Sequence, residues 1–363
     1  MNMIRVTKQA VATALAKASK SYAIAGPVKA GAGHEFCRLG QGQALTKELD
    51  LEYTHTRLSP KALLFPQAEP MFHFKLPETT GEPGDTPPAF LEAESFGESP
   101  LAVVGLRPWD ARALDLLKLN FDTPDYTDPF FMKRYNAMVR VGLADIHPDP
   151  ENFSLAAGSG PFDEASVDIL LADAGDAFIG KVITGKGRDF AGAAGFEPGS
   201  PADEKAFAAL KAAAEKEADI PPACDRINDA DTLDLYHADF WEAAAFSCNN
   251  CGACTFACPT CWCFDIQDEV NQGKGVRLRL WDSCMTDLYS AHASGHNPRE
   301  KGFQRFRNRF MHKLKYFPDK YGAGIMCVGC GRCITQCPGG IDIREVMAAM
   351  NTAAATVQQE VSP

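Results

Sequence analysis

The sequence lacks the signatures of several large protein classes. Its 363 residues contain no run of about 18 uninterrupted apolar residues, so no membrane-spanning helix is predicted. It has no phosphate-binding loop of the G-x-x-x-x-G-K-[ST] type and no G-x-G-x-x-G turn; the G-K-G of residues 185–187 fails the pattern. A nucleophile elbow and a zinc-protease helix are missing too. No nucleotide, flavin, NAD or hydrolase site is therefore visible in the sequence.

An excess of basic residues is also missing. The net charge is −11 at pH 7, which argues against a nucleic-acid binder by bulk charge. The first twenty residues have no long apolar stretch and no cleavage signature. Val11, Leu15 and Ala18 fall at helical spacing, which predicts an amphipathic first helix instead of a signal peptide. Without an export signal, we expect the protein to be cytoplasmic.

Cysteine, in contrast, is abundant and clustered. The chain has 13 cysteines, and only Cys37 and Cys224 lie outside the stretch from Cys248 to Cys337. In a reducing compartment, this usage indicates metal or redox chemistry and not disulfide bonds.

The clustered cysteines form two copies of the run C-x2-C-x2-C-x3-C-P, the spacing of bacterial ferredoxins. The first copy supplies Cys248, Cys251, Cys254 and Cys258, and the second supplies Cys327, Cys330, Cys333 and Cys337. Thiolates two residues apart can wrap one face of an iron–sulfur cubane, and the intervening glycines let the backbone come close. Pro259 and Pro338 turn the chain away after each fourth cysteine.

This spacing predicts two [4Fe–4S] clusters with crossed ligands. In two-cluster ferredoxins, the fourth cysteine of each run ligates the cluster of the other run. We therefore expect one cluster on Cys248, Cys251, Cys254 and Cys337, and the other on Cys327, Cys330, Cys333 and Cys258. Structural zinc is the competing interpretation, but zinc sites use paired C-x2-C units and not four-cysteine runs of this kind.

Three further cysteines, Cys261, Cys263 and Cys284, have no place in these motifs. They could be buried thiols that pack beside a cluster, redox-active thiols, or ligands of a third metal with His292 or His296. The two histidines stand four residues apart, but Gly295 and the following Asn-Pro pair favour a loop, in which hydrogen bonding is their expected role.

The segment between the motifs is basic although the whole chain is acidic. Residues 272–320 contain eleven Lys and Arg but four Asp and Glu. Positive charge near a cluster offsets its negative charge and raises its reduction potential. A solvated helix face and a docking surface for an acidic partner are the alternative interpretations.

The predicted fold class is α+β. Residues 1–222 form a mixed α/β N-terminal domain, and residues 223–363 form a mostly helical, ferredoxin-like domain with both clusters. Strands are predicted at 101–106 and within 167–183, and helices at 111–121, 202–218 and 341–360. The proline pair at 221–222 ends the helix predicted at 202–218 and places the domain boundary.

Several runs of the C-terminal half resemble known iron–sulfur proteins. These runs are CGACTFACPTCWCFDIQDE, RLWDSCM, ASGHNPR, RFRNRFMHK and CVGCGRCITQCPGGIDI. They are similar to the iron–sulfur β subunit of sulfhydrogenase-type nickel–iron hydrogenases and to the corresponding iron–sulfur subunit of anaerobic sulfite reductase. Related subunits accompany heterodisulfide-reductase-linked flavin oxidoreductases. The likeness extends into the N-terminal half through RLSPKALLFPQAEPMFHF and VVGLRPWDARALD.

The resemblance implies an electron-transfer subunit that is not catalytic alone. Such a subunit relays single electrons between an FAD/NAD(P)-binding partner of the diaphorase type and a further redox catalytic subunit. The hydrogenase-type relatives have a cysteine at the position of Trp109 and further cysteines just after the strand that matches VRVGL. If those cysteines hold a third cluster in the relatives, this chain has lost it. Two alternatives remain: a self-contained reductase with an unseen flavin site in the N-terminal domain, and a non-redox binding protein that its clusters stabilise.

Overall fold

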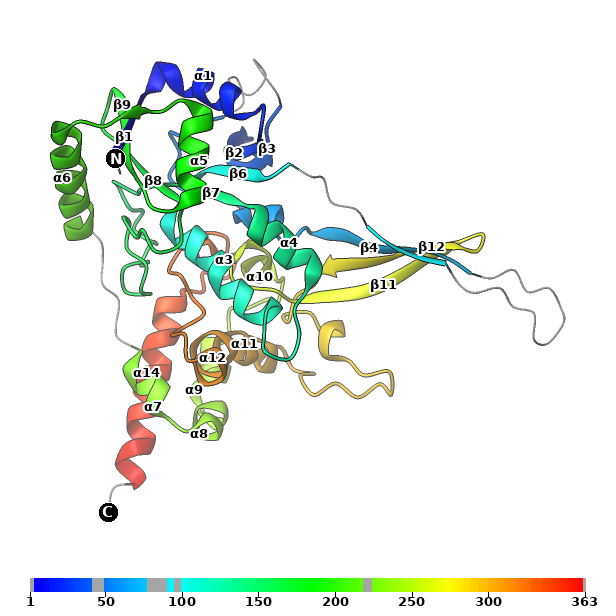
Figure 1. Ribbon diagram of the computed structural model, residues 1–363. Coiled ribbons are helices and arrows are strands. Elements are labelled where there is room, and N and C mark those ends of the chain that lie inside the picture. The colour runs from blue at the N-terminus through cyan, green and yellow to red at the C-terminus, as the bar shows by residue number, and fades with distance from the viewer. Residues whose placement is uncertain (1–2, 41–48, 77–89, 95–98, 218–223, 362–363) are drawn as a thin grey trace.

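The computed structural model describes residues 3–40, 49–76, 90–94, 99–217 and 224–361, with side chains as far as residue 355. The N-terminal part is built on an eight-stranded sheet in the order β10-β1-β9-β8-β7-β6-β2-β3 (Figure 1). Strands β2, β6, β7 and β8 run parallel, and the outer pairs are antiparallel. The strands are β1 (Met3–Thr7), β2 (Ala23–Ala30), β3 (Gly33–Arg38), β6 (Leu101–Leu106), β7 (Val139–Leu143), β8 (Ile169–Asp173), β9 (Ala177–Val182) and β10 (Glu197–Pro198).

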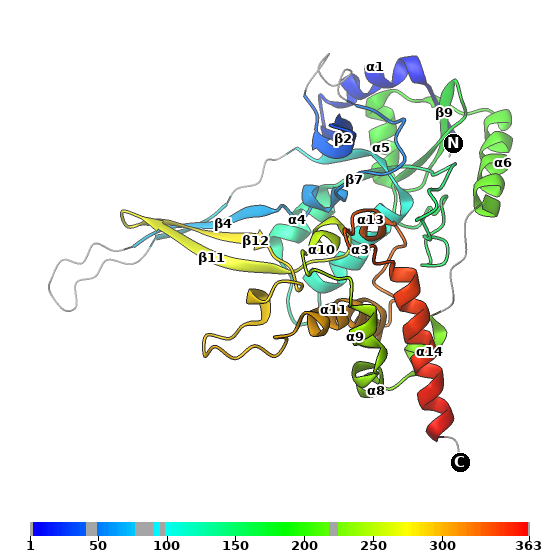
Figure 2. The ribbon, with the colours of Figure 1, turned by 180° about the vertical axis from the view of Figure 1, so that it is seen from behind.

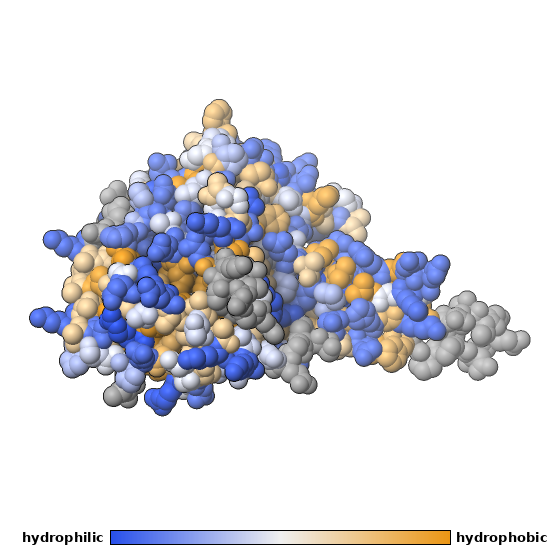
Figure 3. Space-filling model, turned by 90° about the horizontal axis from the view of Figure 1, so that it is seen from above, coloured by the Kyte–Doolittle hydropathy of each residue, from blue (hydrophilic) through white to orange (hydrophobic). Residues whose placement is uncertain are grey.

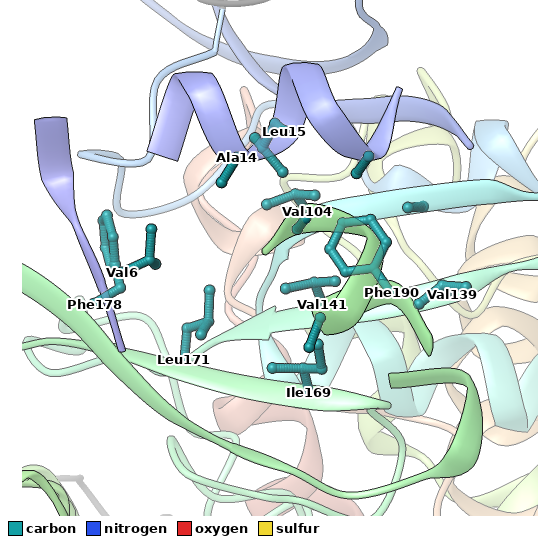
Figure 4. Packing of buried hydrophobic residues seen from close by; sticks show 14 of the residues in the cluster. Val6, Ala14, Leu15, Val104, Val139, Val141, Ile169, Leu171, Phe178 and Phe190 are labelled. Carbon is teal, nitrogen blue, oxygen red and sulfur yellow. The ribbon is translucent and has the colours of Figure 1, made fainter. Parts of the chain in front are cut away.

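Helices cover both faces of this sheet. On one face, α1 (Lys8–Ala18) and α5 (Gly185–Ala194) place Leu15 and Phe190 over Val104 and Val141 (Figure 4). On the other face lie α3 (Pro108–Phe121) and α6 (Pro201–Glu217), while α4 (Pro129–Ala137) follows α3. Because β6 is buried on both faces, its sequence LAVVGL is a continuous apolar run without alternation.

A second, four-stranded antiparallel sheet projects from the body as an arm (Figures 1 and 2). Its strands, in spatial order, are β11 (Phe264–Asn271), β12 (Lys274–Trp281), β4 (Ala68–Lys75) and β5 (Phe90–Ala93). The arm carries exposed apolar side chains such as Leu91, Ile266 and Val270. Apolar and polar groups alternate over its surface in Figure 3.

The C-terminal part is mainly helical and surrounds a separate apolar core that includes Trp241, Phe306, Phe310 and Met350. Its helices are α7 (Asp225–Asp229), α8 (Thr232–His237), α9 (Phe240–Ala244), α10 (Ala253–Ala257), α11 (Gly302–Met311), α12 (Phe317–Tyr321), α13 (Arg332–Thr335) and α14 (Ile343–Val361). A π-helical turn, η3 (His312–Tyr316), joins α11 to α12, and short 3-10 turns lie at η1 (Pro60–Leu63) and η2 (Leu288–Ser290).

The α+β fold class predicted from the sequence is confirmed, because helices and two sheets are present together. The strands at 101–106 and within 167–183 form as expected, and so do the helices near 111–121, 202–218 and 341–360. The hairpin β11–β12 interrupts the part expected to be mostly helical. The predicted boundary at residue 222 lies in 218–223, outside the described residues, and the arm pairs strands from both sides of it. Within the described ranges, no helix is long and apolar enough to cross a bilayer.

Candidate iron–sulfur site

The two cysteine motifs fold in the same way. Each places a glycine with positive φ before a short helix: Gly252 (φ 78°) before α10, and Gly331 (φ 73°) before α13. The third cysteine of each motif, Cys254 or Cys333, is the second residue of that helix. Helices α10 and α13 lie in contact, so the repeat in the sequence becomes a pair of similar turns that face each other.

The first cavity between these turns is lined by four cysteines, three from the first motif and one from the second. They are Cys248, Cys251, Cys254 and Cys337. Phe306, Met285 and Ile341 supply apolar walls around an empty volume of about 390 Å³. Cys251 is exposed, so this cavity approaches the protein surface.

The second cavity is lined by the opposite set, three cysteines from the second motif and one from the first. They are Cys258, Cys327, Cys330 and Cys333. Its empty volume is about 320 Å³, and Phe153 and Ile343 close it. The structure thus brings together the same two groups of four cysteines that the sequence analysis proposed as crossed ligand sets.

The donors of both cavities and their spacing fit a cubane better than a single ion. Zinc holds its sulfur ligands at about 2.3 Å, which requires the sulfurs to converge closely. Among the residues that the structure describes, no three His, Cys, Asp or Glu side chains converge enough to hold one metal ion. Neither cavity has an Asp or Glu among its described lining residues, so the only anionic donors available there are thiolates.

A buried cation contacts Cys258, the cysteine of the first motif that lines the second cavity. Lys313 Nζ lies 3.2 Å from Cys258 Sγ and 3.0 Å from Thr260 Oγ1, and Thr260 Oγ1 is itself 3.2 Å from that sulfur. The hydrogen bond between Cys261 and Cys258, followed by Lys313 and Thr260, outweighs burial and lowers the pKa of the Cys258 thiol well below its ordinary value. Burial opposes the charge of Lys313, but the nearby sulfurs, that of Cys258 foremost and then that of Cys261, outweigh it and raise the pKa of the lysine.

Arg309 is a second buried cation at the cavities. It lines the first cavity and also lies close to Cys333 of the second, to which it hydrogen-bonds. The residue is buried, with 4% of its surface exposed, and yet its Nε has no hydrogen-bond partner. Burial opposes its charge, but Cys254 and Cys333 outweigh that effect and raise the pKa of Arg309.

Burial favours the neutral form of four of the eight motif thiols. Burial raises the pKa of Cys254 to about 11 and that of Cys330 to about 12, and it also raises the pKa of Cys327 and Cys333. A metal ligand must be a thiolate, so binding requires these protons to leave. Buried cations at the same sulfurs favour the ligating form.

Residues far away in the sequence contact the segments that line the second cavity. Arg332, between Cys330 and Cys333, makes a fully buried double ion pair with Asp110 of α3, at 2.6 and 2.7 Å. The Phe153 amide donates to the Gly329 carbonyl at 2.8 Å. Lys61 Nζ donates to the carbonyls of Cys258 and Cys261 at 2.8 and 2.9 Å. Sequence reasoning missed Lys61, Asp110 and Phe153 because no local pattern marks such distant contacts.

The remaining cysteines lie beside this site. The thiol of Cys261 contacts Cys258, and the thiols of Cys263 and Cys284 are hydrogen-bonded to each other. His292 and His296 lie in a turn closed by a bond from the His292 amide to the His296 carbonyl, at 2.8 Å. The described residues bring no group of three such ligands together, so the third metal site weighed in the sequence analysis gains no support. Trp109 is buried against Val328 and Cys330.

Comparisons with known proteins agree with this site. Residues 247–341, which contain both motifs, match the family model of a 4Fe-4S dicluster domain and indicate iron–sulfur clusters as the cofactor. The chain is also 29% identical over 328 residues to the sulfhydrogenase 2 subunit beta of Pyrococcus furiosus, covering 89% of this chain and 90% of that protein. This similarity confirms the resemblance inferred from the motifs. No solved structure matches the chain.

Proposed function

We propose that the chain is an electron-transfer subunit of a sulfhydrogenase-like oxidoreductase complex, with one [4Fe–4S] cluster in each cavity. The observation that carries the proposal is the sorting of eight cysteines into two cavities by crossed sets. Bound clusters of this type accept and release single electrons. The similarity to a hydrogenase subunit beta supports membership of a complex of several subunits.

The residues of this chain would hold the two clusters close together and keep water away from the inner one. The crossed cysteines Cys258 and Cys337 tie each motif to the cavity of the other. The exposed Cys251 makes the first cavity the accessible end of the path. The second cavity lies deeper, behind Phe153 and the Arg332–Asp110 pair.

The expected partners are an FAD/NAD(P)-binding protein of the diaphorase type and a further redox catalytic subunit. This part of the proposal rests on the resemblance and on the subunit name of the similar protein. We propose a cytoplasmic location because free thiols in such number persist in a reducing compartment.

The first test is the content of iron, sulfide and zinc per chain after anaerobic purification, with EPR of the dithionite-reduced protein. Two cubanes predict about eight irons and the spin-coupled signal of two nearby reduced clusters. Zinc in place of iron would refute the proposal. Clusters that cannot be reduced reversibly would favour the non-redox alternative, and flavin bound in the purified chain would favour the self-contained reductase.

A further inference from the structure

The two cavities are alike in their cysteines but differ in the charges that face them. Because the two motifs are copies, corresponding positions can be compared directly. Cys258 and Cys337 are the fourth cysteines of the two runs, and each is followed by proline. Cys258 Sγ contacts Lys313 and Thr260, whereas Cys337 Sγ accepts a bond from the backbone amide of Ile341 at 3.3 Å.

The difference is built into the backbone of the second motif. Thr260 stands two residues after Cys258, and Gly339 holds the equivalent position after Cys337. A Cβ at Gly339 would lie 2.2 Å from the carbonyl oxygen of Ser247. No hydroxyl side chain can therefore be placed there without moving the chain that leads into the first motif.

The lysine is positioned by an irregular turn. Lys313 lies in the π-helical turn η3 and is 2% exposed. Single π-turns inside α-helices are rare and frequently occur at functional sites. Lys313 has no carboxylate partner among its contacts in the described structure; its ammonium group contacts the Cys258 sulfur and the Thr260 hydroxyl. A buried lysine is retained in such a place only if an anion compensates its desolvation.

We propose that Lys313 and Thr260 make the second-cavity cluster the higher-potential member of the pair, while Arg309 raises the potential of both clusters. The inference rests on the proposed function. A cluster gains negative charge on reduction, so a buried cation or hydrogen-bond donor at a ligand sulfur stabilises the reduced form. Lys313 and Thr260 contact Cys258, and Lys313 lines the second cavity but not the first, whereas Arg309 lies between Cys254 and Cys333.

This difference in potential would direct electrons from the first-cavity cluster to the second-cavity cluster. An electron that arrives at the exposed side, near Cys251, finds a lower energy on the inner cluster beside Lys313. Lys313, Thr260 and Arg309 are positioning and charge-setting residues, because they contact ligand cysteines and not an external substrate.

The test is a redox titration, followed by EPR, of the anaerobically purified full chain and its variants. Cys251→Ser and Cys258→Ser assign the two midpoints, because each perturbs one cavity. In Lys313→Met, we expect the ratio of reduced to oxidised second-cavity cluster at a fixed potential to fall about tenfold, which is about 59 mV for one electron. The first-cavity midpoint should stay in place.

Lys315→Met is the matched control. Lys315 lies in the same π-turn and is 5% exposed, but its Nζ donates to the Asn228 carbonyl and pairs with Asp319, away from both cavities. It should leave both midpoints unchanged. Arg309→Met should lower both midpoints. Lys313→Arg should keep the second-cavity midpoint close to its wild-type value, because the positive charge is retained. If Lys313→Met assembles no second cluster, Thr260→Val, which keeps the lysine, should give a smaller shift in the same direction.

The outcomes separate the two proposals. If both clusters are present but the second-cavity midpoint is the lower of the two, this inference is overturned and the electron-transfer function still stands. The same holds if neither Lys313→Met nor Thr260→Val shifts the second-cavity midpoint. An equal shift in Lys315→Met would also overturn this inference. A wild-type chain without iron would overturn both proposals together.

Discussion

Cys258 is the residue at which the crossed arrangement can be tested most directly. It belongs to the first motif in sequence but lines the second cavity. We predict that Cys258→Ser damages the second-cavity cluster and leaves the first, so that iron falls from about eight to about four per chain. Cys337→Ser should do the reverse. Loss of the cluster on Cys248, Cys251 and Cys254 in the Cys258 variant would contradict the assignment.

Cys263 should be an unusually reactive thiol. The hydrogen bond from Cys284 is the main cause that lowers the pKa of Cys263 to about 6. Because this pKa is lower in the folded than in the unfolded chain, ionised Cys263 stabilises the folded chain at pH values above the unfolded pKa. This stabilisation is lost as the pH falls through about 6. We expect alkylation of Cys263 by iodoacetamide, followed by peptide mass spectrometry, to be half-maximal near that pH. Cys284→Ala should move the midpoint upward; an unchanged profile would contradict the role of the bond.

For single residues, the sequence could predict the ligand cysteines but not which charged side chains face them. The spacing of the cysteines alone defines both sets of four, because the run C-x2-C-x2-C-x3-C-P permits few other geometries. The basic segment is visible as an excess of Lys and Arg. Which of these side chains turn inward, as Lys313 and Arg309 do, depends on a π-turn and on a helix face that no composition reveals.

Among the elements, the turn before α13 packs closely against the segment around Glu151. Gly331 has positive φ, and a Cβ there would lie 2.9 Å from the carbonyl oxygen of Glu151. Gly324 has the same φ of 73° but no atom within 4 Å of such a Cβ. Gly324→Ala should therefore cost only the conformational strain, about 1–2 kcal/mol. Gly331→Ala should cost clearly more, because the segment near Glu151 must also move.

The comparison of these two variants is made by thermal unfolding of the iron-loaded protein. The larger loss for Gly331→Ala should be accompanied by faster hydrogen exchange in residues 149–159. Equal losses would show that the contact with Glu151 contributes nothing.

The elements that the sequence predicted well are those with an unambiguous pattern. LAVVGL forms β6 because a short apolar run between turns suits a strand buried on both faces. The hairpin β11–β12 was not foreseen, although charged and apolar residues alternate over KGVRLRLW as they do in a half-exposed strand. Its pairing with β4 adds a contact between segments some 200 residues apart, which local patterns do not encode.

In the whole molecule, the second cavity lies where the N-terminal and C-terminal parts meet. Asp110, Phe153 and Lys61 come from the first part, and the cysteines come from the second. We predict that a fragment of residues 224–363 retains no stable second-cavity cluster. Loss of Asp110 leaves Arg332 without its buried partner, which costs about 3–5 kcal/mol in comparable pairs.

This prediction is checked by iron content and EPR of the fragment beside the full chain. Asp110→Asn in the full chain is the point variant that isolates the ion pair from the other lost contacts. A fragment that holds eight irons would show that residues 224–363 fold and bind both clusters on their own, as the predicted domain boundary near residue 222 suggests.

The crossed cysteines have a further consequence, which concerns the unfolded chain. If the clusters bind as proposed, each one ties together residues roughly 80 positions apart, as Cys254 and Cys337 are. A cross-link over a loop of that length removes conformational entropy from the unfolded state, worth about 4.5 kcal/mol in the chain-entropy account of disulfides. The two clusters would then act as inorganic cross-links between the two motifs. Oxygen that destroys both clusters would release this constraint, so loss of the redox centres would also lower the stability of the fold.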